Sequence, residues 1–289
     1  MDSKKNAKLR KMLNNPGIVV APGVYDAVSA RIAEKSGFET VYMTGNGTVA
    51  SLLGIPDIGL ATMSEMVMRG RQLSACLEVP LICDADTGYG NLNNVRRTVL
   101  EYEAAGVSAI HIEDQCTPKK CGAMEGLALV SAEEAAEKIR VALKARTDPN
   151  FTIIARTDAA KAISLDEAIR RLKMFADAGA DVVFAEMIDT KEDILKITKA
   201  INNVPVMYDV LETTRERAFS IQELESYGVK VVICCLAPLF YTCTKLTEFY
   251  ENYYESGTNL KYFEELMNLH DYEKLMGLEK EHAIRELLK

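Results

Sequence analysis

Pro80-Leu81-Ile82-Cys83-Asp84-Ala85-Asp86 is a short apolar run closed by two acids, and this pattern decides the fold. A continuous hydrophobic run of this length is typical of a parallel strand that is buried on both faces. Eight such runs occur along the chain, at 18–21, 40–43, 80–83, 109–112, 152–155, 182–185, 205–208 and 231–234.

Helical patterns separate these runs, at 24–35, 63–75, 93–105, 132–146 and 165–178. Several of them end in Ala-Gly or Ser-Gly, a common helix stop, and the stops fall at Gly37, Gly106, Gly179 and Gly228. Eight strand-helix units of this length predict a (β/α)8 TIM barrel. A doubly wound open sheet is the competing topology.

Composition narrows the class of protein. The 289 residues allow two domains or one large α/β barrel, and a hydrophobic content of 48% is enough for one sizeable core. The seven cysteines form no CxxC pair, which favours free thiols and a cytoplasmic location. No apolar stretch approaches the roughly 20 residues of a membrane span. The net charge of −8, without a basic block, argues against nucleic acid as a partner.

Polar side chains follow six of the predicted strands. In a TIM barrel the active site lies at the carboxyl ends of the strands, so these residues are expected to meet at one rim. The candidates in chain order are Tyr42, Thr44, Gly45, Asn46, Asp84, Asp86, Glu113, Arg156, Glu186 and Asp209.

Asp84, Asp86 and Glu113 predict a metal site, because Asp84 and Asp86 face the same way and Glu113 follows the neighbouring strand. Asp57 brings a fourth acid to the same rim. Carboxylates without nearby His or Cys ligands favour a hard ion such as Mg²⁺, with Mn²⁺ as a substitute, held largely through water. Each of these acids could instead cap the helix that follows it and have no role in metal binding. His111 lies among apolar residues and is expected in the core.

Two further stretches carry candidate chemistry. The glycines of Thr44-Gly45-Asn46-Gly47 let backbone N–H groups approach a small anion such as a carboxylate, and Arg156 is suited to clamp one. In Lys119-Lys120-Cys121-Gly122 the flanking charges are expected to lower the thiol pKa and make Cys121 an acid/base residue. Alternatively, Cys121 is a small buried hydrophobic residue without a chemical role. That is the expectation for Cys76, Cys83, Cys234, Cys235 and Cys243.

Together these motifs resemble the isocitrate lyase and phosphoenolpyruvate mutase superfamily, in particular its methylisocitrate-lyase-like branch. The resemblance implies a Mg²⁺-dependent lyase acting on 2-hydroxy di- or tricarboxylates by retro-aldol cleavage. The metal would lie among the four acids, substrate would contact Lys119, Lys120 and Gly122 as well as the rim, and Cys121 would protonate the carbanion. Tyr42 or a bound water is the candidate base. The matching stretches are 22–26, 84–91, 111–115, 118–122 and 154–159.

Departures from the family pattern bear on the substrate. Ala123 stands where isocitrate and methylisocitrate lyases carry a histidine, Asp209 where they usually carry Asn, and Cys235 where methylisocitrate lyases commonly carry Pro. An added carboxylate and a lost histidine disfavour a third substrate carboxylate. The expected substrate is therefore a methylated malate, 2,3-dimethylmalate, cleaved to pyruvate and propionate. 2-Methylisocitrate lyase, oxaloacetate hydrolase or decarboxylase, and a noncatalytic metal-dependent carboxylate-binding protein are the alternatives.

The chain is expected to divide into a catalytic barrel at 1–240 and a helical extension at 241–289. The extension has more apolar residues than one barrel helix needs. The resemblance implies that it is exchanged between subunits of a homo-oligomer, commonly a tetramer. The loop from Gln115 to Leu129 is long for a strand-helix connection and is expected to act as a lid.

Overall fold

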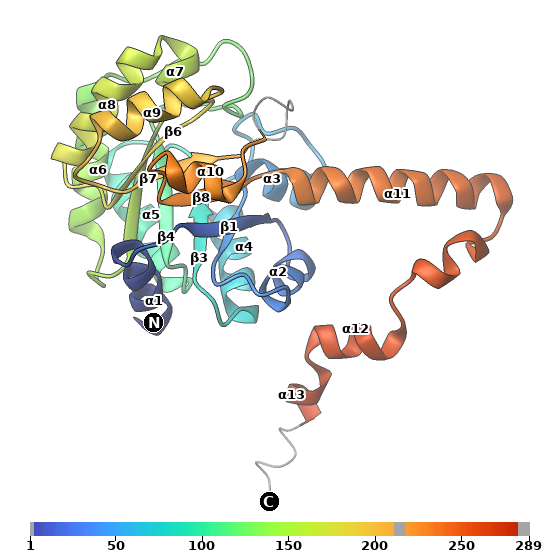
Figure 1. The fold of residues 1–289 in the computed structure, drawn as a ribbon. Coiled ribbons are helices and arrows are strands. Elements are labelled where there is room, and N and C mark those ends of the chain that lie inside the picture. Colours follow the sequence, from blue (N-terminus) through green and yellow to red (C-terminus); the bar gives the residue numbers. More distant parts are fainter. Residues whose placement is uncertain (1–2, 211–217, 283–289) are drawn as a thin grey trace, which may run out of the picture.

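The computed structural model describes residues 3–210 and 218–282, and its centre is a closed barrel of eight parallel strands (Figure 1). Each strand pairs with its neighbours in chain order, and β1 closes the barrel against β8. The predicted TIM barrel is therefore confirmed and the open sheet is excluded. The strands are β1 (Val19–Val24), β2 (Val41–Met43), β3 (Leu81–Asp84), β4 (Ala109–Glu113), β5 (Thr152–Thr157), β6 (Val182–Ala185), β7 (Val206–Asp209) and β8 (Val231–Cys234).

Helices surround the barrel and extend beyond it. The predicted helix at 24–35 begins only at Ala27, because Val24 still belongs to β1 and Asp26 caps the helix. The helices are α1 (Ser3–Asn14), α2 (Ala27–Lys35), α3 (Gly45–Leu53), α4 (Met63–Cys76), α5 (Leu92–Ala104), α6 (Ala132–Ala145), α7 (Ala159–Ala162), α8 (Leu165–Asp177), α9 (Lys191–Ala200), α10 (Ile221–Ser226), α11 (Ala237–Ser256), η2 (Leu260–Glu265), α12 (Leu269–Met276) and α13 (Leu278–His282).

The glycine-rich stretch after β2 begins helix α3, which is not among the helices predicted from the sequence. Thr44 is extended and its side chain accepts a hydrogen bond from Gly47 N, so it caps α3. A helix was not expected there because its first turn contains two glycines, which are poor helix formers. The start of this helix lies at the barrel rim, where Gly45 and Asn46 line a cavity described below.

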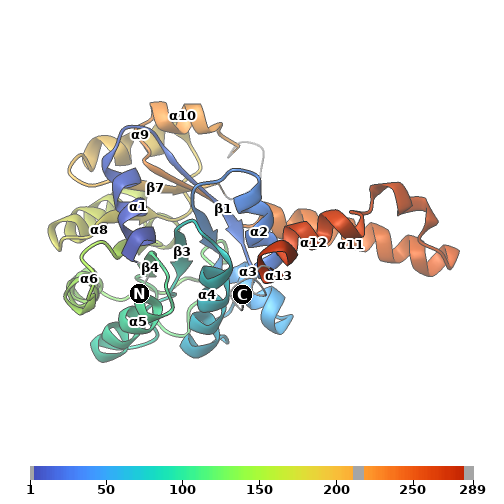
Figure 2. The same cartoon turned by 90° about the horizontal axis from the view of Figure 1, so that it is seen from below.

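The strand register brings the predicted site residues into line. Asp84 pairs with His111 across β3 and β4, and Glu113 pairs with Arg156 across β4 and β5. Because all eight strands run parallel, their carboxyl ends lie at the same end of the barrel, and the polar residue after each run reaches that rim. The opposite end of the barrel is covered by α1, whose Leu9 and Leu13 belong to the interior core (Figure 2).

The C-terminal segment leaves the barrel. In Figure 1, α11 projects away from it, and the chain then turns back through η2 and α12. No residue of α11 is buried, while α12 contacts α2. The expected domain boundary at residue 240 lies inside α11, which runs without a break from Ala237. Within the described ranges, none of the helices has the length and apolar character needed to span a membrane.

Candidate active site

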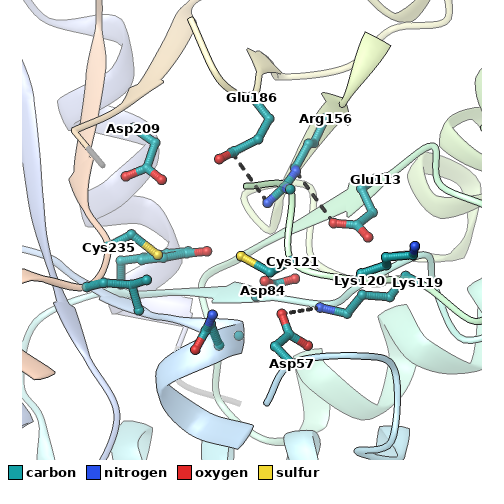
Figure 3. A pocket seen from close by; sticks show the side chains of 15 residues that line it. Asp57, Asp84, Glu113, Lys119, Lys120, Cys121, Arg156, Glu186, Asp209 and Cys235 are labelled. Atoms are coloured by element: carbon teal, nitrogen blue, oxygen red, sulfur yellow. Dashed lines mark hydrogen bonds and ion pairs between the residues drawn. The ribbon is translucent and has the colours of Figure 1, made fainter. Parts of the chain in front are cut away.

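A cavity of about 30 Å³ lies at the carboxyl end of the barrel (Figure 3). It joins the ends of seven strands to the loop that carries Cys121. Its lining residues are Tyr42, Gly45, Asn46, Asp57, Asp84, Glu113, Lys119, Lys120, Cys121, Gly122, Arg156, Glu186, Asp209, Cys235 and Leu236.

Two of the predicted site residues do not line this cavity. Thr44 is buried behind it as the cap of α3, and Asp86 lines a neighbouring cavity. Cys235 and Leu236 do line it, although Cys235 was expected to be an ordinary core residue. The Cys235 Sγ lies 3.1 Å from Thr44 Oγ1, because residues just after a strand point toward the rim. The place of Cys235 directly after the eighth predicted strand is the sequence feature that could have identified it as a cavity residue.

Lys119 lies between two of the predicted metal ligands. Its Nζ is 2.8 Å from Asp57 Oδ2 and 2.6 Å from Asp86 Oδ1, and only 6% of the side chain is exposed. Burial lowers the pKa of Lys119, but the acids around it outweigh burial and raise the pKa well above its usual value. Burial raises the pKa of Asp86 to about 6, even though Lys119 opposes this shift. The ammonium therefore stays charged and neutralises part of the acid cluster.

Other carboxylate oxygens at the rim suit a hard cation. Glu113 Oε1 is buried without a hydrogen-bond partner among the described residues, and so is Asp57 Oδ1, the oxygen of Asp57 that does not contact Lys119. Burial raises the pKa of Glu113 well above its usual value, although Arg156, 3.5 Å away, opposes this shift. Across 3–210 and 218–282, no three His, Cys, Asp or Glu side chains are placed to hold a metal ion by themselves. All-oxygen donors with few direct protein ligands fit Mg²⁺, which keeps several waters.

Arg156 is surrounded by acids. Its Nε and Nη2 donate to the two carboxylate oxygens of Asp158, at 3.2 and 2.8 Å. Glu113 and Glu186 each lie 3.5 Å from the guanidinium, on either side of it. The guanidinium is thus held at the cavity wall, with Asp158 fixing its plane.

The pKa of Cys121 shifts in the direction opposite to the one expected from its flanking lysines. Burial raises the pKa of the thiol, and hydrogen bonds with Ala123 and Asn46 offset this only in part. The lysines do not compensate, because Lys119 faces Asp57 and Lys120 Nζ donates to Glu125 O at 3.2 Å. The thiol is therefore protonated at neutral pH, the state that a proton donor requires.

Tyr42 and His111 form a buried pair beside the acids. Tyr42 Oη lies 2.8 Å from His111 Nε2, and the ring of His111 also packs edge-on against Phe184. His111 is indeed buried, as expected, but it also contacts a residue of the cavity. Burial lowers the pKa of His111 to about 4, and burial raises that of Tyr42 well above its usual value. Both groups are therefore neutral near pH 7.

Two glycines are required by close contacts at the site. A Cβ at Gly45 would lie 2.2 Å from Asp84 Oδ2, so only glycine lets the start of α3 approach that carboxylate. A Cβ at Gly122 would lie 2.6 Å from both Arg156 Nη2 and Asp158 Oδ1. The residue after Cys121 thus packs directly onto the arginine and its partner.

The loop that carries Cys121 is folded onto the site. Cys121 N donates to Asp57 O at 3.0 Å, and Gln115 exchanges two hydrogen bonds with the backbone of Lys120. A bridge between Gln115 and Leu129 closes the base of the loop. All seven cysteines are free, as predicted. Of the five expected to be buried, only Cys83 is buried, while Cys76, Cys234 and Cys235 are half-buried and Cys243, on α11, is exposed.

Proteins with named enzymatic activities are similar to this chain over most of its length. The 2,3-dimethylmalate lyase of Eubacterium barkeri is 44% identical over 239 residues, which cover 83% of this chain and 82% of the relative. A 2-methylisocitrate lyase of Aeropyrum pernix is 40% identical over 225 residues, covering 78% of this chain and 72% of the relative.

Solved structures agree with the sequence comparison. Oxaloacetate acetylhydrolase in complex with 3,3-difluorooxalacetate has a TM-score of 0.92 at 32% identity, covering 98% of this chain and 96% of that one. Phosphonopyruvate hydrolase in complex with oxalate and Mg²⁺ has a TM-score of 0.88 at 29% identity, covering 98% of each chain. The family model of phosphoenolpyruvate phosphomutase matches residues 9–253. The chain therefore belongs to the phosphoenolpyruvate phosphomutase family and is a lyase of the PEP mutase/isocitrate lyase superfamily.

Proposed function

We propose that the chain is a Mg²⁺-dependent carbon–carbon lyase that cleaves 2,3-dimethylmalate to pyruvate and propionate. The observation that carries the proposal is a protonated thiol, Cys121, that lines one cavity with Arg156, Asp57 and Glu113. Asp57 Oδ1 and Glu113 Oε1 accept no hydrogen bond among the described residues. Similarity to the lyase of Eubacterium barkeri supports the choice of this acid.

Asp57, Asp84, Asp86 and Glu113 would hold the metal, largely through water. When bound, Mg²⁺ supplies Lewis-acid stabilisation of the oxygen that becomes the 2-oxo group. Mn²⁺ offers the same coordination chemistry and is the expected substitute. Phosphonopyruvate hydrolase, a structural neighbour, binds Mg²⁺ together with oxalate, a small dicarboxylate like those proposed for this site.

The side chains bind and orient the substrate. Arg156 and the N-terminal turn of α3, at Gly45 and Asn46, face the cavity and suit the two carboxylates. Lys119, Lys120 and Gly122 close the cavity from the loop side. Glu186 and Asp209 line the far wall and disfavour a third carboxylate there. Thr44, as the cap of α3, supports this arrangement from behind.

Cleavage requires one base and one acid. Tyr42 or a bound water removes the proton of the 2-hydroxyl. Because Tyr42 is a neutral phenol, it can accept that proton only by passing its own to His111 Nε2, 2.8 Å away. The bond between C2 and C3 then breaks, which releases pyruvate and leaves a carbanion at C3. Cys121 donates the proton that converts this carbanion to propionate.

The test is a panel of acids supplied to the enzyme with Mg²⁺, with pyruvate measured by a coupled assay. The expected result is the highest kcat/KM on 2,3-dimethylmalate, with loss of turnover when the metal is chelated. A preference for 2-methylisocitrate or oxaloacetate would change the substrate and keep the carbon–carbon chemistry. An absence of turnover on every acid would support a carboxylate-binding protein instead.

The C-terminal segment supports a homo-oligomer, with a tetramer as the specific proposal. Residues 241–289 would act as an extension of a barrel at 1–240 and be exchanged with a neighbouring subunit. Six large apolar side chains of α11 are at least 46% exposed in a single chain, which is unusual for a helix that packs only on its own barrel. These six are Phe240, Tyr241, Leu246, Tyr250, Tyr253 and Tyr254.

A further inference from the structure

A second, larger cavity of about 350 Å³ lies at the same rim, beside the catalytic one. It sits between the loop before α4, the segment after β3, the first turns of α5 and the Cys121 loop. The proposed reaction uses only two of its residues. Its lining is Gly59, Ala61, Thr62, Met63, Ser64, Asp86, Thr87, Tyr89, Asn94, Arg97, Thr117 and Lys119.

Lys119 separates the two cavities, because it lines both of them. The backbone of the same residue is packed against Gly59, where a Cβ would lie 2.9 Å from Lys119 O and 3.1 Å from Lys119 N. The wall between the cavities is thus a single segment of the Cys121 loop together with Asp86. Movement of this segment would join the two spaces.

The lining of the second cavity is suited to an anion. Its charged side chains, among the described residues, are Asp86, Lys119 and Arg97. Asp86 and Lys119 form an ion pair of 2.6 Å, so Arg97 supplies the net charge. The acid nearest to Arg97 is Glu101, at 3.7 Å, and both of these side chains are well exposed. The other polar residues of the wall are neutral: Thr62, Ser64, Thr87, Tyr89, Asn94 and Thr117.

A cation at this cavity would help an anionic substrate to approach the protein. The chain carries a net charge of −8, and the catalytic cavity is lined by five acids and three basic residues. Two of the basic residues, Lys119 and Arg156, are already paired with acids, so a further exposed cation at the rim adds attraction for a dicarboxylate. Arg97 is the cation at the wall of the larger cavity that no buried acid neutralises.

We propose that the larger cavity is a vestibule, in which Arg97 and the surrounding hydroxyls bind a carboxylate of the substrate before it passes Lys119 into the catalytic cavity. The identity of the acid rests on the proposed function. The binding of a small carboxylate at Arg97 does not, and it can be measured separately.

The first test compares Arg97→Gln with Arg96→Gln. Arg96 is exposed on the same helix and lines neither cavity, so both variants lose one charge from the same region. Arg97→Gln should lower kcat/KM about threefold at low ionic strength and leave kcat unchanged, because capture and not chemistry is affected. The difference should disappear in high salt. Equal effects of the two variants would overturn the proposal.

The second test fills the cavity without changing charge. Ser64 lines the vestibule and is exposed at the start of α4, so Ser64→Phe should fold. It should lower kcat/KM about as much at high salt as at low salt. Gln72→Phe, at an exposed position later in α4 and outside both cavities, is the matched control. A normal kcat/KM in Ser64→Phe would count against passage through this cavity.

A binding measurement separates failure of the vestibule from failure of the proposed function. If no acid is turned over, pyruvate binding to the Mg²⁺-loaded protein can still be followed by ligand-observed NMR. Weaker binding in Arg97→Gln than in Arg96→Gln would support the vestibule even then. Identical binding in the two variants would reject it, whichever acids the enzyme cleaves.

Discussion

The barrel rim and the C-terminal arm, residues 237–282, reverse the usual distribution of polar and apolar side chains. At the rim, charged groups are buried: Lys119 and Arg156 are 6% and 7% exposed. On the arm, large apolar groups are exposed, and Tyr254 reaches 91%. Both arrangements are unfavourable for an isolated chain in water. They differ in what compensates the cost.

At the rim the compensation comes from within the chain. Arg156 is paired with Asp158, and Lys119 with Asp57 and Asp86, so the buried charges are largely balanced. Among the described residues the arm has no comparable compensation, because α11 buries none of its residues. Under the proposals above, a single chain would contain the catalytic groups, and the arm would be covered by another subunit.

Replacing the thiol at the rim is expected to have the largest effect. If Cys121 protonates the carbanion, Cys121→Ser should lower kcat at least a hundredfold, because a serine hydroxyl is a much weaker acid. Mg²⁺ binding, measured by calorimetry, should be retained. Cys243→Ser, which changes the exposed thiol on α11, is the control and should keep normal activity. Near-normal turnover of Cys121→Ser would remove this residue from the mechanism.

Charges placed on the arm should break the assembly and spare the barrel fold. Tyr250 and Tyr254 lie one turn apart on α11 and are 61% and 91% exposed. Replacing both by Glu should convert the oligomer to smaller species in light scattering at micromolar concentration. Glu251→Lys, an exposed charge reversal on the same helix, is the control. A wild-type chain that is already monomeric would contradict the proposed role of the arm.

The sequence predicts the barrel well, because its signals are local. Each predicted apolar run overlaps one strand, although the ends agree only for β2, β6 and β8 and the other strands continue for one to three residues. Polar residues lie at or just after most strand ends, so most of the cavity lining could be identified in advance. The start of α3 could not, since two glycines in its first turn conceal a helix whose cap depends on Thr44.

The electrostatics of the site could not be read from sequence spacing. Lys119 and Lys120 flank Cys121 in the chain, yet their ammonium groups bond elsewhere, and burial determines the thiol pKa. Cys235 was assigned to the core because its neighbours are apolar, whereas its place after β8 directs it to the cavity. Side-chain direction in a folded loop depends on tertiary contacts that neighbouring residues do not specify.

Substrate preference offers a finer test of the rim. If the absence of a histidine at Ala123 disfavours a third carboxylate, Ala123→His should raise kcat/KM on 2-methylisocitrate relative to 2,3-dimethylmalate by about tenfold, the value of one charge-assisted hydrogen bond. Parallel assays on the two acids measure this ratio. Ala123→Gln tests whether any longer polar side chain has the same effect. An unchanged ratio in the histidine variant would separate position 123 from specificity.

The loop at the rim should respond to ligand while the arm does not. If residues 115–129 close over the substrate, Mg²⁺ with pyruvate should slow proteolytic cutting in the loop several-fold, because the closed loop presents less free backbone to a protease. Cutting in residues 257–268, between α11 and α12, provides the internal control and should be unaffected. Equal protection of both segments, or of neither, would argue against a lid.

The smallest effect concerns the pKa of Cys121. Only a thiolate reacts quickly with iodoacetamide, and burial raises the pKa of this thiol, so its alkylation should be slow at neutral pH and should keep increasing as the pH rises above 8. Peptide mass spectrometry measures this rate alongside that of the exposed Cys243, which should be labelled several-fold faster at pH 7. If the flanking lysines instead lowered the pKa of Cys121, its labelling would be fast at pH 7 and level off before pH 8. That profile would make Cys121 a thiolate in the resting enzyme and assign the protonation of the carbanion to another group.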